Sequence, residues 1–221
     1  MKRALIIGAS GGIGNALAVE TARRGMRVTP LSRSETGLDI TSQASVDAAL
    51  AALDGPFDLI FVATGALQIG GHGPEKSLRQ IDANDLHAQF AVNAIGPALI
   101  LKHAPRLLPR DARAVLAVLS ARVGSIGDNR LGGWYGYRAA KAAVNQIVHS
   151  AAIEIARTHP HAVLAAMHPG TVATPFTADF VKPGTATPPA DAASNLLNVL
   201  DGLTSAQSGG FFDYAGEPIP W

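Results

Sequence analysis

A glycine-rich segment near the start of the chain constrains its fold more than any other feature. Four glycines fall within residues 8–14 (GASGGIG), after an apolar run, Arg3–Ala9, that predicts a buried strand. A helical pattern follows and continues to about Arg24, where Gly25 supplies a stop. Glycines in such a turn let the backbone approach a phosphate closely, and the helix N-terminus offers free N–H groups and a positive dipole. The segment predicts a phosphate-binding turn, with a purely structural turn as the alternative.

The rest of the chain repeats the alternation of strand and helix. Five further apolar runs predict strands, and helical patterns lie between most of them. The strands are expected at Arg27–Arg33, Phe57–Ala63, Ala112–Ser120, Val163–Met167 and Gly210–Tyr214, and the helices at Ser42–Leu53, Asn84–Leu107, around Tyr137 to near His159, and Ala190–Leu200. This alternation predicts an α/β fold with a doubly wound, mostly parallel sheet flanked by helices. The length of 221 residues suits a single domain, residues 1–221.

The end of the second strand bears on nucleotide recognition. In dinucleotide-binding folds an acidic residue there binds the ribose 2′-hydroxyl, whereas an arginine accommodates a 2′-phosphate. No acidic residue occurs between Val28 and Ser34, and Arg33 lies at the tip of the strand. The sequence therefore favours NADP(H) over NAD(H), with a solvated Arg33 as the alternative. A short strand, Leu38–Ile40, is expected so soon afterwards that no crossover helix fits between the two.

Tyr137 and Lys141 lie four residues apart in a helical pattern. Their side chains should share one face, with Cβ atoms roughly 5–6 Å apart, and the same stripe continues through apolar Val144 and Val148 toward the core. An ammonium ~5 Å from a phenol, at an effective dielectric constant of ~20, contributes about 3.3 kcal/mol and lowers the phenol pKa by roughly 2.4. Tyr137 is therefore predicted to act as a general acid–base. The alternative is a packed tyrosine beside a lysine whose ammonium reaches solvent.

Other polar residues stand at the ends of apolar runs. Asn93 precedes Gly96-Pro97, and its amide needs partners, either in a catalytic site or as a brace for the helix interruption expected there. Ser120 ends the strand before the Tyr137 helix. Thr64-Gly65 ends the third strand, where backbone could approach a ligand. A lone histidine, His168, is expected to be packed or hydrogen-bonded rather than a ligand.

Composition excludes several classes of protein. Without cysteine the chain has neither a disulfide framework nor a thiolate metal site, and no metal cluster is evident. The net charge is +1 with no run of like charge, so nucleic-acid binding is not expected. No uninterrupted apolar run reaches the ~18 residues of a membrane span, and the N-terminus lacks a signal-peptide pattern. A cytoplasmic location is therefore expected.

Taken together, these motifs resemble the short-chain dehydrogenase/reductase family over nearly the whole chain. The match consists of the glycine turn 8–14, Asn93, Tyr137-x-x-x-Lys141 and residues 169–174 (PGTVAT). The loop 124–135, the missing second crossover helix and the Pro-Trp terminus are similar to the C-factor and sniffer-like carbonyl reductases within that family.

The resemblance implies a role for each site residue. Tyr137 would donate a proton to a carbonyl as NADPH delivers hydride, and Lys141 would bind the nicotinamide ribose and lower the Tyr137 pKa. Asn93 would hold a water that relays protons to Lys141, and a serine near Ser120 would hydrogen-bond the carbonyl oxygen. The cofactor contacts would be Gly8, Ser10, Gly12, Ile13, Gly14, Arg33, Asp39, Ile40, Ala63, Thr64, Gly65, Tyr137, Lys141, Pro169, Gly170, Val172 and Thr174. Asp39 and Ile40 would border the adenine, and Val172 and Thr174 the nicotinamide carboxamide.

Two positions depart from the family pattern. Ile7 stands where the family usually has threonine, which should cost little. Ala121 stands where the catalytic serine is usual, three residues before Gly124. We predict that Ser120 takes that role, with Ser125 as the alternative.

Two functions follow from the resemblance. The first is an NADPH-dependent carbonyl reductase that acts on a small-molecule carbonyl or alcohol. The second is an NADP(H)-binding regulatory or signalling protein with weak or vestigial catalysis. A sugar-nucleotide epimerase is disfavoured, because no substrate domain follows the last strand. Residues Leu67–Gln80 and Phe176–Pro189 are expected to rim the cleft, the second as a lid. A homodimer or homotetramer is expected, as is common in the family.

Overall fold

One six-stranded sheet forms the centre of the computed structural model, which describes residues 2–182 and 184–221. The strand order is β2-β1-β3-β4-β5-β6, and every neighbouring pair is parallel. The strands are β1 (Arg3–Ile7), β2 (Arg27–Leu31), β3 (Leu59–Val62), β4 (Ala114–Leu119), β5 (Ala162–His168) and β6 (Gly210–Asp213). The chain goes from β1 to β2 on one side and then crosses to β3 on the other side of β1. The predicted doubly wound α/β fold is therefore confirmed.

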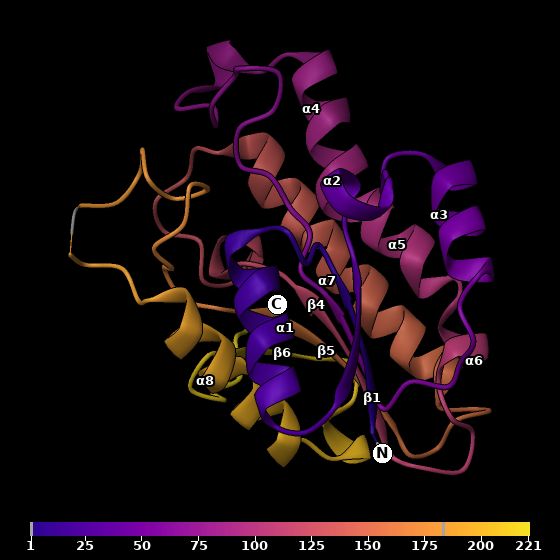
Figure 1. Cartoon of the computed structure of the whole chain (residues 1–221). Helices are drawn as coiled ribbons and strands as arrows, with labels where there is room; N and C mark the ends of the chain where they lie inside the picture. The colour runs from indigo at the N-terminus through magenta and orange to yellow at the C-terminus, as the bar shows by residue number, and fades with distance from the viewer. Residues whose placement is uncertain (1, 183) are drawn as a thin grey trace.

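Helices cover both faces of this sheet (Figure 1). On one face, α1 (Gly12–Arg23) packs against α8 (Pro189–Gly202). On the other face lie α3 (Gln43–Ala51), α5 (Gly96–Leu101) and α7 (Tyr135–Ile155). The shorter helices are α2 (Arg33–Thr36), α4 (Ala83–Phe90) and α6 (Ala104–Leu107), with 3₁₀ turns at Leu78–Gln80, Arg122–Gly124 and Ser205–Gln207. No helix within residues 2–182 and 184–221 is both long and apolar enough to cross a membrane.

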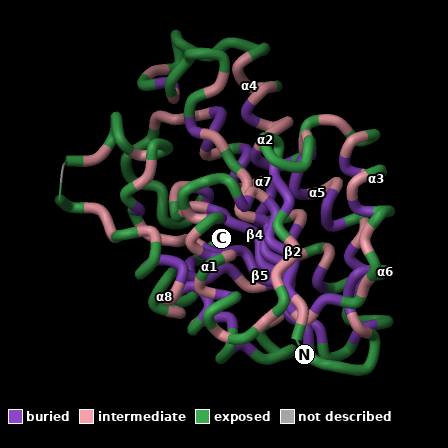
Figure 2. The backbone as a smooth tube through the Cα atoms, in the orientation of Figure 1, coloured by how far each residue is buried: buried purple, intermediate pink, exposed green. Residues whose placement is uncertain are grey.

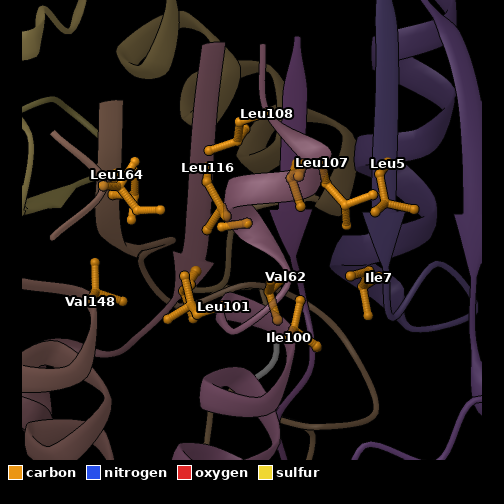
Figure 3. Packing of buried hydrophobic residues seen from close by; sticks show 14 of the residues in the cluster. Leu5, Ile7, Val62, Ile100, Leu101, Leu107, Leu108, Leu116, Val148 and Leu164 are labelled. Carbon is orange, nitrogen blue, oxygen red and sulfur yellow. The ribbon is translucent and has the colours of Figure 1, made fainter. Parts of the chain in front are cut away.

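Two apolar layers hold the helices on the sheet. Because successive side chains of a strand point to opposite faces, Leu5 and Ile7 join the layer under α5 and α7, whereas Ile6 packs toward α1 and α8. Figure 3 shows the first layer, in which Leu116 and Leu164 come from neighbouring strands. Burial on both faces explains why most strands read as continuous apolar runs and are buried almost throughout, whereas the edge strand β2 buries only Leu31 (Figure 2).

The strand register brings the functional segments to one edge of the sheet. Ile7 at the end of β1 pairs with Val62, which pairs in turn with Val118 of β4. Leu119 of β4 pairs with Met167 of β5. The loops that follow these four strands therefore start at the same level. Side chains far apart in the sequence can meet there, at the point where the strand order reverses.

Two details after β2 differ from expectation. Strand β2 ends at Leu31, because the Ser32 side chain accepts a hydrogen bond from Glu35 N–H and caps α2, a single helical turn where none was expected. The predicted strand Leu38–Ile40 is wrong. Leu38 N–H donates to Ser32 C=O at 3.2 Å, and Asp39 N–H donates to the Ser45 hydroxyl at 3.0 Å. These donors serve a turn and a helix cap, so they are not available for a strand ladder.

The predicted long helix at 84–107 is interrupted earlier than Gly96-Pro97. Between α4 and α5 the backbone forms a π-helical turn, Ala91–Ile95, which contains Asn93. Gly96 follows directly, and a Cβ there would lie 2.9 Å from Ile40 Cδ1. The glycine therefore lets the start of α5 approach the 38–40 segment. A π turn of this kind often marks a functional site.

Candidate active site

A cavity of about 560 Å³ lies at the carboxyl edge of the sheet. Its walls come from the loops after β1, β3, β4 and β5, from the first turns of α7, and from the 175–181 segment. Many of the predicted site residues line it: Ser10, Gly12, Ile13, Ala63, Thr64, Gly65, Ser120, Tyr137, Lys141, Pro169, Gly170, Val172 and Thr174. The tertiary structure thus brings together the glycine turn, the end of β3, Ser120, the Tyr137–Lys141 pair and the 169–174 loop. The predicted residues outside its wall are Gly8, Gly14, Arg33, Asp39, Ile40 and Asn93.

The glycine turn is packed too closely for larger residues. Gly8 has φ +89°, and a Cβ there would lie 2.9 Å from the Ala63 carbonyl carbon and oxygen. A Cβ on Gly14 would lie 2.0 Å from Gly8 O, and one on Gly12 would lie 2.5 Å from Thr174 Cγ2. Helix α1 begins at Gly12 with neither a capping side chain nor an acidic residue in its first turn. Its N–H groups and dipole therefore suit an anion in the cavity.

Three buried polar atoms in the cavity wall have no hydrogen-bond partner among the described residues. They are Thr64 Oγ1, Ser120 Oγ and His168 Nδ1. Leaving such an atom unpaired costs about 1–3 kcal/mol, so a polar ligand would relieve the penalty. His168 was expected to be packed or hydrogen-bonded rather than a ligand, and it lies in the cavity wall. Burial lowers the pKa of His168 to about 4, and Arg122 adds to this, so its imidazole is neutral at pH 7.

The two candidate serines have different surroundings. Ser125 is buried outside the cavity wall, where its hydroxyl donates to Pro220 C=O and accepts from Asp128 N–H at 3.0 Å. Ser120 lies in the wall, and its N–H continues the β4–β5 ladder by donating to Met167 C=O at 2.8 Å. Ser125 therefore anchors the C-terminal segment, and Ser120 is the one that can reach a ligand. Its catalytic role stays a prediction.

Tyr137 and Lys141 face the core from the first turns of α7, as the stripe of apolar residues predicts. Tyr137 is 5% exposed and Lys141 is 2% exposed. Lys141 Nζ lies 5.7 Å from the centroid of the Tyr137 ring and donates to Leu119 C=O at 3.0 Å. The loop after β4 presses on this turn, since a Cβ on Gly124 would lie 2.8 Å from Lys141 Cβ. The ammonium is therefore held in place beside the phenol.

The electrostatics of this pair differ from the expectation. Burial raises the pKa of Tyr137, and it lowers the pKa of Lys141 to about 8. The predicted downward shift of the Tyr137 pKa is therefore wrong in direction. The sequence estimate counted only Coulomb attraction, whereas removal from water disfavours phenolate and ammonium alike. A bound ligand that supplies hydrogen bonds to either group would change this balance.

Asn93 braces the loop after β3. Its Nδ2 donates to Ala66 C=O at 2.8 Å and to Gln89 Oε1 at 2.8 Å, and its Oδ1 accepts from Ala66 N–H at 3.1 Å. Gln89 Nε2 in turn donates to Leu67 C=O at 3.0 Å. The side chain of Asn93 thus fixes a wall of the cavity without lining it. Sequence reasoning missed Gln89, although its position four residues before Asn93 on a helical face was an available signal.

The predicted adenosine-binding residues lie beyond the cavity. Arg33 is exposed in the first turn of α2. The Asp39 carboxylate accepts from the Thr41 hydroxyl at 2.7 Å and from Thr41 N–H at 2.9 Å, and these bonds, with a smaller contribution from Arg33, lower the Asp39 pKa. Ile40 packs on the core. These three residues stand past the end of β2, next to the glycine turn in the β1–β2 register.

An aromatic wall on the other side of Tyr137 escaped the sequence analysis. The Trp134 ring is 6.4 Å from Tyr137 and 5.7 Å from Phe180, and Phe176 is 6.2 Å from Tyr137, all between centroids. Trp134, Phe176 and Phe180 line the cavity from loops. Loops carry no periodic pattern, so these residues gave no signal beyond the expectation that Phe176–Pro189 rims the cleft. Pro183, within that segment, lies outside the described residues.

Comparison with known proteins identifies the family. Residues 30–198 match the sequence profile described as Enoyl-(Acyl carrier protein) reductase. The chain is also 30% identical to the 1-hydroxy-2-glutathionyl-2-methyl-3-butene dehydrogenase of Rhodococcus sp. (strain AD45), over 100% of both chains. The chain belongs to the short-chain dehydrogenase/reductase family. The predicted resemblance is therefore confirmed.

Other members of this family are similar to the chain at different levels. C-signal of Myxococcus xanthus is 35% identical over 66% of this chain and 84% of that protein. The carbonyl reductase Sniffer of D. melanogaster has the same fold, with a TM-score of 0.85 and 19% identity over 100% of both chains. A putative short-chain dehydrogenase/reductase from Burkholderia multivorans with bound NADP has a TM-score of 0.81 and 25% identity, over 100% of this chain and 99% of that one.

The site fits a dinucleotide by its own chemistry. The glycine turn lines the cavity, and the N-terminus of α1 that follows it has no capping side chain, which suits a pyrophosphate. Thr64 Oγ1 and Ser120 Oγ provide unpaired hydroxyls, and Lys141 provides a buried ammonium. Thr174 packs against Gly12 of the glycine turn, and Val172 lines the same cavity. In a short-chain dehydrogenase/reductase these are the groups that could hold the phosphates and the nicotinamide riboside.

Proposed function

We propose that the protein is an NADPH-dependent carbonyl reductase that acts on a small-molecule ketone or aldehyde, or on the alcohol in reverse. The observation that carries this proposal is the shared cavity. Ser120 Oγ is unpaired in the same wall as Tyr137 and Lys141, beside a glycine turn built for a phosphate. A carbonyl oxygen placed among these groups would meet a hydrogen-bond donor and a proton donor at once.

Each residue then has a defined task. When bound, the nicotinamide cofactor supplies a hydride to the carbonyl carbon. Ser120 orients the carbonyl oxygen, and the Tyr137 hydroxyl gives it the proton that completes the alcohol. Lys141 holds a positive charge beside Tyr137 and stabilises the phenolate that forms. A water near Asn93 would return a proton through Lys141. Both Nδ2 protons of Asn93 are engaged with Ala66 and Gln89, whereas its Oδ1 accepts only from Ala66 N–H and keeps a lone pair for such a water.

NADP(H) is the proposed cofactor over NAD(H). Arg33 is exposed past the end of β2 and is free of a salt bridge among the described residues, so it can turn toward a 2′-phosphate. The Burkholderia multivorans relative with bound NADP supports the same choice. The cytoplasmic location and the homodimer or homotetramer stay predictions of the sequence.

The second candidate is an NADP(H)-binding regulatory or signalling protein with weak catalysis. The similarity to C-signal favours it, as does Ala121 at the usual position of the family's serine. The unpaired Ser120 hydroxyl in the cavity weighs against it, since it offers a replacement for that serine.

Nucleotide binding and turnover separate these two candidates. NADPH and NADH are titrated into the purified protein by fluorescence, and a panel of carbonyls is assayed with wild type and Tyr137→Phe. We expect tighter binding of NADPH and turnover that falls by about 10²–10⁴ in the variant. Tyr135→Phe, in the same first turn but outside the cavity wall, is the matched control. Binding without turnover on any carbonyl would favour the regulatory protein, and no binding of either nucleotide would overturn both.

A further inference from the structure

Helix α7 begins without a cap of its own. Its N-cap residue, Trp134, makes no capping hydrogen bond with its side chain, and the first turn contains no acidic residue. Trp134 also has φ 53° and ψ 41°, and it is the only non-glycine residue with positive φ within residues 2–182 and 184–221. A bulky residue in this left-handed conformation is held there at a cost of about 1–3 kcal/mol by its surroundings. The start of the helix that carries Tyr137 therefore depends on another part of the chain.

That support comes from Glu75, on the rim loop Leu67–Gln80. Trp134 N–H donates to Glu75 C=O at 2.5 Å, and Gly136 N–H donates to both carboxylate oxygens of Glu75 at 3.2 Å. The Glu75 residue is 7% exposed, although its carboxylate forms no salt bridge among the described residues. A buried carboxylate is costly unless charge or hydrogen bonds compensate it, and here the N-terminus of α7 supplies both.

Gly136 is shaped for this carboxylate. A Cβ on Gly136 would lie 2.8 Å from Glu75 Oε1, 3.2 Å from Leu86 Cδ2 and 3.3 Å from Gln89 Cγ. The absence of a side chain thus lets Glu75 reach the helix terminus. Gln89 also orients Asn93, so the same contact region links the rim loop, the π turn and α7.

The hydrogen bonds of Glu75 reach two positions at the start of α7, next to the cavity. One position is Trp134, whose ring stands between Tyr137 and Phe180. The other is Gly136, directly before Tyr137. We propose that Glu75 is a positioning residue of the active site: its carboxylate holds the first turn of α7 under Tyr137, and this docking keeps its main-chain carbonyl in place against Trp134 N–H. This inference rests on the proposed function, because its kinetic effect is read from carbonyl turnover.

Kinetics of three variants test the proposal. Glu75→Ala removes the carboxylate, Glu75→Gln keeps an oxygen acceptor of the same length, and Gly136→Ala adds a methyl that displaces the carboxylate. We expect Glu75→Ala and Gly136→Ala to lower kcat by about 10–100-fold with KM for NADPH unchanged, because a small misplacement of a reacting group has effects of that size. We expect Glu75→Gln to recover most of the loss. Asp191→Asn, an exposed carboxylate in the first turn of α8, is the matched control.

Gly136→Ala separates positioning from simple helix stability. Alanine is a better helix former than glycine, so a purely structural helix start would gain stability from this change and keep its kcat. The positioning role instead predicts a loss of kcat that shrinks when Glu75→Ala is already present. If Glu75→Ala does not fold, Gly136→Ala and Glu75→Gln still decide the question.

A second readout is independent of turnover. The chain has two tryptophans, so Trp221→Phe leaves Trp134 as the single reporter. In that background Glu75→Ala should raise acrylamide quenching of Trp134, because without the carboxylate on Gly136 N–H the Glu75 carbonyl is no longer held against Trp134 N–H. Asp191→Asn should not raise it. Unchanged quenching together with a wild-type kcat in Glu75→Ala and Gly136→Ala would overturn the proposal. The proposal would also be overturned if Glu75→Ala lowered kcat and NADPH affinity equally and Glu75→Gln restored neither. If the wild type reduces no carbonyl, the proposed function fails, and Trp134 quenching alone decides the role of Glu75.

Discussion

The two sides of the cavity are built in different ways. The glycine side, residues 8–14 with the ends of β1 and β3 and the 169–174 loop, is made largely of backbone. Its contacts are so close that single methyl groups would clash. The aromatic side, Trp134 with Phe176 and Phe180, consists of side chains from loops that contact one another through ring edges.

Under the proposed function, this difference indicates that one side of the cavity binds the cofactor and the other binds the substrate. A backbone cradle can hold the constant part of a reaction, the phosphates of a cofactor, because its geometry is set by strand ends and a helix terminus. Side chains on loops can be replaced without disturbing the sheet, so they suit the part that varies, the substrate. Tyr137 and Lys141 lie between the two sides on a rigid helix.

The largest effect is expected between the two sides of the cavity, from Lys141→Met. Burial lowers the pKa of Lys141 from 10.5 to about 8, so the unfolded chain binds more protons than the folded one between these pH values. The free energy of unfolding should therefore rise with pH from 8 toward 10 in the wild type. Removing the buried charge should stabilise the protein at pH 7 by about 2–3 kcal/mol. The lowered pKa of Lys141 corresponds to a gain of about 1.4 kcal/mol per pKa unit, and the loss of its one hydrogen bond subtracts part of that gain.

Urea unfolding of both proteins at pH 7, 8, 9 and 10 measures this. The rise should be absent from Lys141→Met. The wild-type series stops at pH 10, because above this pH the raised pKa of Tyr137 makes the free energy of unfolding fall as pH rises. A wild-type stability that falls between pH 8 and 10 would contradict the prediction.

On the glycine side, Gly12→Ala should weaken NADPH binding. The added methyl would lie 2.5 Å from Thr174 Cγ2 and would force the turn and the 169–174 loop apart. Overpacking of this kind costs about 1–3 kcal/mol, or roughly 5–150-fold in Kd. Fluorescence titration measures the loss, with Gly202→Ala as the control, since no atom lies within 4 Å of a Cβ there. Equal NADPH affinity in the two variants would show that the close packing at Gly12 is not needed for cofactor binding.

Past the end of β2 and outside the cavity wall, Arg33→Ala should reduce the preference for NADPH. The loss of one exposed, charge-assisted contact to a 2′-phosphate should weaken NADPH binding by about 10-fold, or 1.4 kcal/mol, and leave NADH binding unchanged. Arg27→Ala, an exposed arginine at the opposite end of β2, provides the comparison. If both nucleotides weaken together, Arg33 does not discriminate between them.

The smallest effect is expected on the aromatic side, from Phe180→Ala. Phe180 is 37% exposed and contacts Trp134 at 5.7 Å, so the truncation removes one ring contact of about 1 kcal/mol. We expect kcat/KM to fall by about fivefold for ketones with aromatic groups and to stay unchanged for small aliphatic ones. The Kd of NADPH should not change. A parallel loss of NADPH affinity would show that the two sides are not independent.

The fold could be predicted from the sequence wherever burial leaves a periodic signal. The six strands of the sheet were all expected. Those covered on both faces are continuously apolar, whereas the edge strand β2 buries only Leu31. A further strand expected at Leu38–Ile40 is absent from the described residues. The buried Leu38 gives this segment an apolar signal, but its N–H groups bond within a turn and a helix cap. The π turn at Asn93 could be expected only as an interruption, since its widened hydrogen-bond pattern has no residue signature.

The candidate site could be predicted only where side-chain spacing or glycine reveals it. Tyr137 and Lys141 were found from helical spacing, and the glycine turn from composition. Glu75 was not, because its partner Gly136 is 61 residues away, and Gln89 was missed although Asn93, four residues on, offered a signal. The pKa of Tyr137 was predicted in the wrong direction, since the cost of burial depends on how completely the surrounding chain excludes water.

The sequence by itself therefore determined the order of strands and helices, the glycine turn and the pairing of Tyr137 with Lys141, because each rests on contacts between residues near one another in the chain. Only the tertiary structure decided that Ser120 rather than Ser125 faces the cavity, and that Glu75 holds the start of α7. Those outcomes depend on which distant segment occupies the space around a side chain. Local sequence does not encode that space, which is set when the sheet and its two helical layers pack together.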